Sequence, residues 1–285
     1  MICQPHSEMP NRCQLLAAIP PIHPGAVQLL RLAGGPSQDL GHIVGLLRSG
    51  AVPADELTRA ANSPLFVCRY EIRNPLQALV YLGLERIKAL VATTAMRDLA
   101  DAARGGLKYV YWRHNLATAI ICQRLSASVK LPSERCYMGG LIHDVGRLAL
   151  LAVLPEYEHF GLLADPMTED LPATERKLFG WTHDEAGRWL LAQWGFPIEL
   201  QNVAAFHENP AAAPSCDRAV IGLVHAGSQI ADLVGMSAFP SGRDGRLREA
   251  AFSLSEIAGE GLSVDIADIA EWVVAKVNGI ELSLS

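Results

Sequence analysis

Four histidines and one aspartate between residues 114 and 207 are the residues whose types could bind a metal ion. They are His114, His143, Asp144, His183 and His207. Imidazole nitrogens and carboxylate oxygens are common protein ligands of zinc, iron and manganese. The intervals between these residues match no short metal-binding motif, so spacing alone does not define a site.

The adjacent pair His143 and Asp144 is the one locally unusual feature. It lies in an apolar stretch that we predict to be a single helix over residues 133–154. An acid and an imidazole inside such a helix are costly to bury unless they are paired or bound to a cation. Glycines flank the pair at positions 139, 140 and 146. They would let a neighbouring helix approach, at roughly 1 kcal/mol each in helix propensity relative to alanine.

The other histidines occupy positions consistent with an internal site. His114 and His207 fall on apolar faces of predicted helices, and His183 follows the predicted N-cap Thr182. The positive end of a helix dipole disfavours an imidazolium at His183, and the neutral imidazole is the form that binds metal. The alternative is that each histidine is a hydrogen-bonded core residue and that Asp144 is a buried acceptor.

Hydrophobic periodicity predicts helices almost throughout, without the alternation of strands. In the first half we expect helices over 26–33, from a cap at Ser37 through 47, 53–61, 75–82 and 84–102. In the second half we expect helices over 111–129, 133–154, 183–194, 197–208, 215–236, 247–258 and 264–277, with a loop over 237–246.

Composition excludes several classes of protein. The chain has 285 residues and a net charge of −6, which argues against a broad basic face for nucleic acid. The longest clean apolar run, residues 148–154, is far short of the roughly 20 residues that a membrane span needs. The first residues lack the pattern of a signal peptide. The six cysteines form no Cys-x-x-Cys pair, as expected of reduced thiols. We therefore expect a soluble cytoplasmic protein.

Several motifs occur in an order that resembles a known family. Residues 141–148, Leu-Ile-His-Asp-Val-Gly-Arg-Leu, resemble the helix that defines the HD superfamily. Ala-Asn-Ser at 61–63 and Leu-Gly at 82–83 are similar to a signature of HDOD domains, the HD-related output domains. The block His-Asp-Glu-Ala-Gly at 183–187, followed by Trp-Gly-Phe-Pro at 194–197, is similar to the same family. The resemblance covers roughly residues 10–236.

The resemblance implies an all-α fold in a bacterial signalling protein. We expect an N-terminal helical lobe over residues 10–105 packed on a five-helix HD-type core over 106–236, followed by a helical tail over 247–285. Catalytic HD relatives, including the HD-GYP cyclic di-GMP phosphodiesterases, bind metal through histidines and the His-Asp pair. Carried over by position, these ligands are His114, His143, Asp144, His183 and His207.

Two positions depart from the catalytic pattern. Ser228 stands where the family's late helix has its final aspartate ligand, and Asp232 lies one turn on, about 6 Å further along the axis. The loss of that carboxylate argues against a two-metal cluster and favours one divalent ion of iron, manganese or zinc. Arg147 stands where the phosphodiesterases usually have lysine, and we expect it to bind phosphate.

The sequence thus favours a non-catalytic signalling output or scaffold module with a degenerate metal site. It would act on protein partners, and we expect no membrane or nucleic-acid partner. A homodimer is one possible assembly. The alternative is a metal-dependent phosphohydrolase for a nucleotide or cyclic dinucleotide, in which Arg147 holds the phosphate. A third reading is regulated nucleic-acid binding by Arg243, Arg246 and Arg248, against which the net negative charge weighs.

Overall fold

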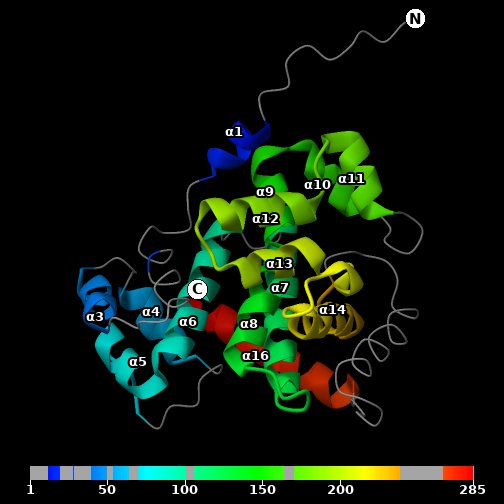
Figure 1. Cartoon of the computed structure of the whole chain (residues 1–285). Coiled ribbons are helices and arrows are strands. Elements are labelled where there is room, and N and C mark those ends of the chain that lie inside the picture. Colours follow the sequence, from blue (N-terminus) through cyan, green and yellow to red (C-terminus); the bar gives the residue numbers. More distant parts are fainter. Residues whose placement is uncertain are drawn as a thin grey trace, which may run out of the picture.

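Every regular element that the computed structural model describes is a helix (Figure 1). The described residues are 12–19, 28, 40–49, 54–63, 70–100, 106–163, 170–237 and 266–284. The expected all-α fold class is therefore confirmed. The predicted helices over 26–33 (apart from Gln28) and 247–258, the predicted loop beyond residue 237, and the three arginines at 243, 246 and 248 lie outside the described residues.

The described helices of the first part of the chain gather on one side of the molecule, except for the first of them (Figure 1). They are α1 (Arg12–Ala17), α3 (Leu40–Arg48), α4 (Ala54–Ala61), α5 (Pro75–Leu82) and α6 (Leu84–Leu99). The side chain of Asn74 caps α5 by accepting the backbone N–H of Gln77 at 2.9 Å. Gly83, with φ of 78°, ends α5 and leads directly into α6.

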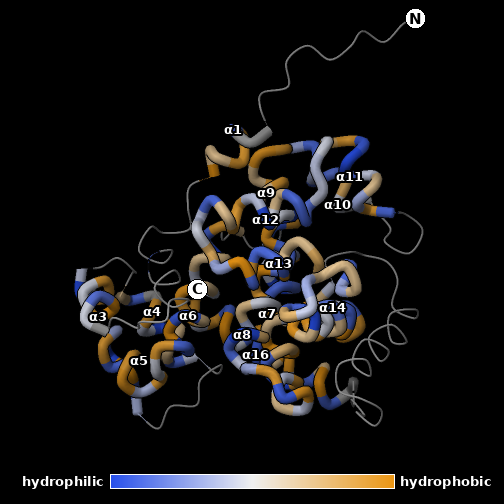
Figure 2. The backbone as a smooth tube through the Cα atoms, viewed as in Figure 1, coloured by the Kyte–Doolittle hydropathy of each residue, from blue (hydrophilic) through white to orange (hydrophobic). Residues whose placement is uncertain are grey.

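Helix α7 (Leu107–Ser126) runs through the centre of the second part. It packs against α8 (Ser133–Ile142), α14 (Arg218–Leu233) and α6. Most of its side chains are buried, in keeping with its contacts on several sides. Elsewhere hydrophobic and hydrophilic stretches alternate along most helices, as amphipathic helices require (Figure 2).

The predicted single helix over 133–154 is wrong, because the chain breaks at the His-Asp pair. Helix α8 ends at Ile142 and α9 (Val145–Val153) begins after Asp144, whose φ of −105° and ψ of 23° leave the helical region. The ring Nδ1 of His143 lies 2.7 Å from the carbonyl oxygen of Gly140, in the last turn of α8. The imidazole thereby satisfies a carbonyl that the helix end leaves open.

Residues Ser133–Val153, which include α8 and α9, are also the one described segment that is long and apolar enough to cross a bilayer. In this structure 83% of that apolar window is buried inside the protein. The segment also carries a buried histidine, aspartate and arginine. These features fit the core helices of a soluble protein.

The remaining helices cover the region around this break. They are α10 (Glu156–Leu163), α11 (Leu171–Phe179), α12 (His183–Gln193), α13 (Ile198–Phe206) and the 3-10 turn η1 (Pro210–Ala212). The predicted capping box at the start of α12 is confirmed: Thr182 accepts from the N–H of Glu185, and the Glu185 carboxylate accepts from the N–H of Thr182.

The C-terminal helix α16 (Ile266–Leu284) packs against α7 and α4. It continues seven residues beyond the predicted end at Val277. Its apolar residues Ile269, Val273 and Val277 are buried within the chain. At the edge of this contact the guanidinium of Arg124 lies 4.7 Å from the ring centroid of Trp272.

Two glycines allow the helices around the His-Asp pair to touch backbone to backbone, as the sequence predicted. A Cβ at Gly140 would lie 2.6 Å from the Cα of Ala119 in α7. A Cβ at Gly146 would lie 1.8 Å from the carbonyl oxygen of His183 and 2.7 Å from the backbone nitrogen of Gly187 in α12. Helix α12 is therefore held at the start of α9 by a contact that admits no side chain.

We predict that Gly146→Ala destabilises the protein by more than about 2 kcal/mol, because neither backbone can move away without repacking α9 and α12. The free energy of unfolding in urea measures this effect. Gly45→Ala in α3 is the matched control, since a Cβ there meets nothing within 4 Å. It should be neutral or stabilising by up to about 1 kcal/mol. Equal stabilities of the two variants would contradict the tight contact.

Candidate metal centre

The structure brings the side chains of all five predicted ligands into one buried cluster. Their coordinating atoms form two overlapping groups, and within each group these atoms lie within 4.8 Å of one another. The first group is His114, His143 and Asp144, and the second is Asp144, His183 and His207. The carboxylate of Asp144 is thus shared by both groups.

Helix ends and helix junctions position most of this cluster. His143 directly follows α8, Asp144 precedes α9, His183 begins α12 and His207 directly follows α13, whereas His114 lies within α7. The four imidazoles form a row. The ring centroids are 5.4 Å apart from His114 to His143, 5.0 Å from His143 to His207 and 5.4 Å from His207 to His183.

Three of the imidazoles are fixed in the same tautomer by backbone carbonyls. Nδ1 of His143 lies 2.7 Å from the Gly140 oxygen, and Nδ1 of His207 lies 3.1 Å from the Ala204 oxygen. Nδ1 of His114 lies 2.9 Å from the oxygen of Met236. A carbonyl oxygen only accepts, so each Nδ1 carries a proton, and in the neutral form of the ring Nε2 presents a lone pair. Metal-binding histidines usually make such a hydrogen bond from the ring nitrogen that does not bind the metal.

Two of these Nε2 atoms accept no hydrogen bond from the described residues. Nε2 of His143 and Nε2 of His207 are buried and have no hydrogen-bond partner there. Burial, together with the nearby imidazoles of His207 and His114, lowers the pKa of His143 to about 3, although Asp144 opposes the shift. The His143 ring is therefore neutral at ordinary pH. A buried, neutral imidazole with an open Nε2 atom fits a divalent metal ion.

The carboxylate of Asp144 is ionised and already paired with Arg147. Nε of Arg147 donates to both carboxylate oxygens at 2.9 Å. Burial of Asp144 opposes its ionisation, but Arg147 and the surrounding imidazoles hold the pKa of Asp144 well below its usual range. Arg147 itself is 1% exposed, and whether it binds phosphate, as expected from the resemblance, stays a prediction.

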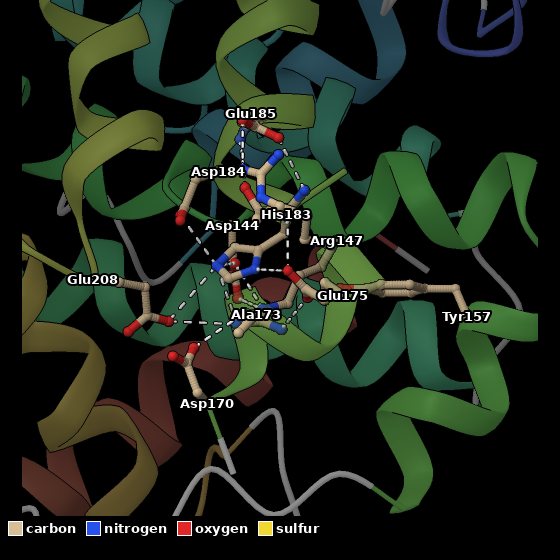
Figure 3. Close-up of polar contacts among 12 residues, drawn as sticks. Asp144, Arg147, Tyr157, Asp170, Ala173, Glu175, His183, Asp184, Glu185 and Glu208 are labelled. Atoms are coloured by element: carbon tan, nitrogen blue, oxygen red, sulfur yellow. Dashed lines mark hydrogen bonds and ion pairs between the residues drawn. The ribbon is translucent and has the colours of Figure 1, made fainter. Parts of the chain in front are cut away.

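Glu175 in α11 completes this buried network, and sequence reasoning missed it. Its carboxylate accepts from Nη1 of Arg147 at 3.2 Å, from the Tyr157 hydroxyl at 2.5 Å and from the backbone N–H of His183 at 2.9 Å (Figure 3). A signal was present: Glu175 lies four residues after buried Leu171, so it falls on the apolar face of its own helix.

His183 differs in charge from the expectation. Its Nδ1 lies 2.7 Å from Oε2 of Glu175, and its Nε2 lies 3.2 Å from Oδ1 of Asp184. Burial and Arg147 lower the pKa of His183, but the carboxylates of Asp184 and Glu175 outweigh them and raise it well above its ordinary value. We expected a neutral ring from the helix dipole alone, and the nearby carboxylates override that effect.

Ser228 and Asp232 contact opposite edges of the His114 ring. The hydroxyl of Ser228 lies 3.1 Å from Nε2, whereas a carboxylate oxygen of Asp232 lies 3.5 Å from Nδ1. Asp232 therefore does not replace the missing aspartate at the Nε2 side, where a metal ion would lie. Its carboxylate lies instead on the Nδ1 side, where it can orient the ring.

Comparisons with known proteins place the fold. The sequence pattern described as the HDOD domain matches residues 19–210. An HDOD domain protein of unknown function from Geobacter sulfurreducens is 21% identical with a TM-score of 0.73, covering 96% of this chain and 97% of its own. A protein from Marinobacter aquaeolei provisionally named a signal transduction protein is 19% identical, with a TM-score of 0.69 and coverage of 98% and 61%.

A protein from Shewanella amazonensis provisionally named a metal-dependent phosphohydrolase is 20% identical, with a TM-score of 0.61 and coverage of 97% and 100%. At these identities the likenesses show a shared fold. A comparison with curated proteins found no match. The matched residues 19–210 include all five predicted ligands, whereas Ser228 and Asp232 lie beyond them.

We predict that Glu175→Gln destabilises the protein by about 3–5 kcal/mol, because it leaves the buried guanidinium of Arg147 short of a counter-charge. Glu185→Gln is the matched control. Glu185 pairs with Arg176 at the surface, and glutamine can keep its capping role. Urea unfolding at neutral pH should show a large loss for the first variant and little change for the second. Similar losses in both would show that the Glu175 network adds no special stability.

Proposed function

The chain belongs to the HDOD family, and from that membership and the site we propose a signalling module that binds one divalent metal ion and does not hydrolyse phosphate esters. It acts on a protein partner inside the cell. Membrane and nucleic acid are not among its partners, and a homodimer remains open. A bound metal ion would connect the helices that supply its ligands.

The observation that carries this proposal is the pair of buried Nε2 atoms on His143 and His207 that have no hydrogen-bond partner among the described residues. His143 forms one group of nitrogen and oxygen ligands with His114 and Asp144, and His207 forms the other with His183 and Asp144. Such a set suits zinc, iron or manganese better than calcium or magnesium. The ion in the site is therefore expected to be one of those three.

We infer the absence of catalysis from the small number of negatively charged ligands in the site. A neutral hydroxyl, that of Ser228, faces Nε2 of His114 where catalytic relatives are expected to carry an aspartate. Asp144 is then the one carboxylate in the first group. Phosphodiester cleavage by two metals needs ligands that hold both ions 3.5–4 Å apart, roughly. A single ion bound mostly by imidazoles lacks that arrangement.

Metal binding can act as a signal through the elements that supply the ligands. His114 belongs to α7, His143 and Asp144 join α8 to α9, and His207 ends α13. An ion that binds only this native arrangement stabilises it by mass action. The occupied and empty forms would then present a partner with helices of different rigidity.

We predict that the purified protein carries one ion of zinc, iron or manganese per chain and that His143→Ala carries none. Elemental analysis of protein purified without chelator measures the content. His159→Ala is the matched control, because His159 is an exposed histidine of α10 and it should leave the content unchanged. A metal-free wild type that is as well folded as the His143→Ala variant would refute metal binding.

The second candidate function, a metal-dependent phosphohydrolase, is favoured by the same open Nε2 atoms, since a bound ion could generate hydroxide. In this reading Arg147 holds the phosphate. The substrate bis-p-nitrophenyl phosphate, with added Mn²⁺ or Fe²⁺ under reducing anaerobic conditions, separates the two functions. We expect hydrolysis no faster than that of the His143→Ala variant. A rate that this variant abolishes would establish the hydrolase instead.

A further inference from the structure

Arg147 carries an inference that rests on the proposed metal function. We propose that its guanidinium is a permanent cation in the place where this site would otherwise hold a second metal ion. The chain would thus bind one exchangeable ion in its first group of ligands and supply the other positive charge covalently.

The contacts of Arg147 coincide with the second group of potential ligands. That group consists of Asp144, His183 and His207. Nε of Arg147 binds both oxygens of Asp144 at 2.9 Å, and its Nη2 lies 3.2 Å from Nε2 of His183. The guanidinium therefore lies directly against the ligand atoms of two of the three side chains.

Further carboxylates surround the same guanidinium (Figure 3). Its Nη1 lies 3.2 Å from Oε1 of Glu175, and its Nη2 lies 3.4 Å from Oε1 of Glu208. Three carboxylates and one imidazole are a mixed oxygen and nitrogen set of the kind that binds divalent ions. Here that set encloses a side chain that is 1% exposed.

An open nitrogen remains on His143 in the first group and on His207 in the second. Nε2 of His143 has no hydrogen-bond partner among the described residues, and the same holds for Nε2 of His207, which lies 3.6 Å from Asp144. The arginine thus covers one side of Asp144, and the unused lone pairs lie on the imidazoles in the middle of the row. The guanidinium lies against His183 at one end of the row, so that place is already filled by a cation, and the place for an ion is on the side of His143.

A positively charged side chain has a physical advantage over a bound metal ion. Asp144 and Glu175 are both buried, and their charges must be compensated for the chain to fold. A guanidinium stays charged at every pH at which the protein is folded and needs no metal from the medium. The fold can then form whether or not an ion is bound, and the ion is left free to report a signal.

The test is the metal content of Arg147→Gln relative to wild type. Each protein is equilibrated with excess zinc, freed of unbound ion by gel filtration and submitted to elemental analysis. We expect Arg147→Gln to hold about one more ion per chain than wild type. Arg135→Gln is the matched control: it removes an arginine whose Nη2 lies 2.7 Å from Asp217, away from the histidines, and it should leave the content unchanged.

A double variant covers the case in which Arg147→Gln fails to fold without metal. Arg147→Gln with Glu175→Gln removes one positive and one negative charge, so the buried net charge is kept. Asp144, His183 and His207 remain as ligands. We expect this variant also to gain about one ion over wild type. Its midpoint of thermal unfolding should rise more on addition of zinc than that of wild type.

The difference in metal content between variant and wild type tests this inference, whereas the metal content of wild type alone tests the proposed function. A metal-free wild type with a gain in the variants would overturn the proposed function and its exchangeable ion, and would support only the placement of the guanidinium where a second ion would bind. Folded variants with the wild-type content would overturn the inference alone. Variants that stay unfolded even with zinc would also overturn it, because an ion in the vacated place should restore the lost charge.

Discussion

The buried charge of Asp144 is the constraint on which the rest of the site depends. A carboxylate that is 4% exposed needs compensation from every side, and helices distant in sequence provide it. Arg147 lies one turn along α9, His183 begins α12 and His207 ends α13. The close contact of α9 with α12 at Gly146 brings two of these helices together at the carboxylate.

Much of the fold follows from local sequence signals, because those signals act within a few residues. Thr182 forms the helix cap that its side chain and that of Glu185 predict. The five potential ligands could be named from their types and from the family resemblance, and the structure gathers them. The glycines that permit close contact were also identifiable, since a missing Cβ has a purely steric consequence.

The rest depended on interactions between distant residues. Periodicity predicted an unbroken helix through His143, because the apolar pattern continues across the break and the capping contact of His143 is a side-chain effect. Glu175 is acidic but lies on the apolar face of its own helix, and its partner Arg147 lies 28 residues away. The charge of His183 could not be judged from its place at a helix start, since Glu175 and Asp184 determine it.

The two histidines that follow α8 and α13 have a consequence for how such residues persist in evolution. His143 and His207 each satisfy a carbonyl three residues earlier, in the last turn of the helix before them. A mutation that removes either ring would leave a helix end unsatisfied even in a chain that binds nothing. Selection for foldability alone can therefore retain these residues. Their survival in a sequence is accordingly poor evidence that an ancestral reaction has survived with them.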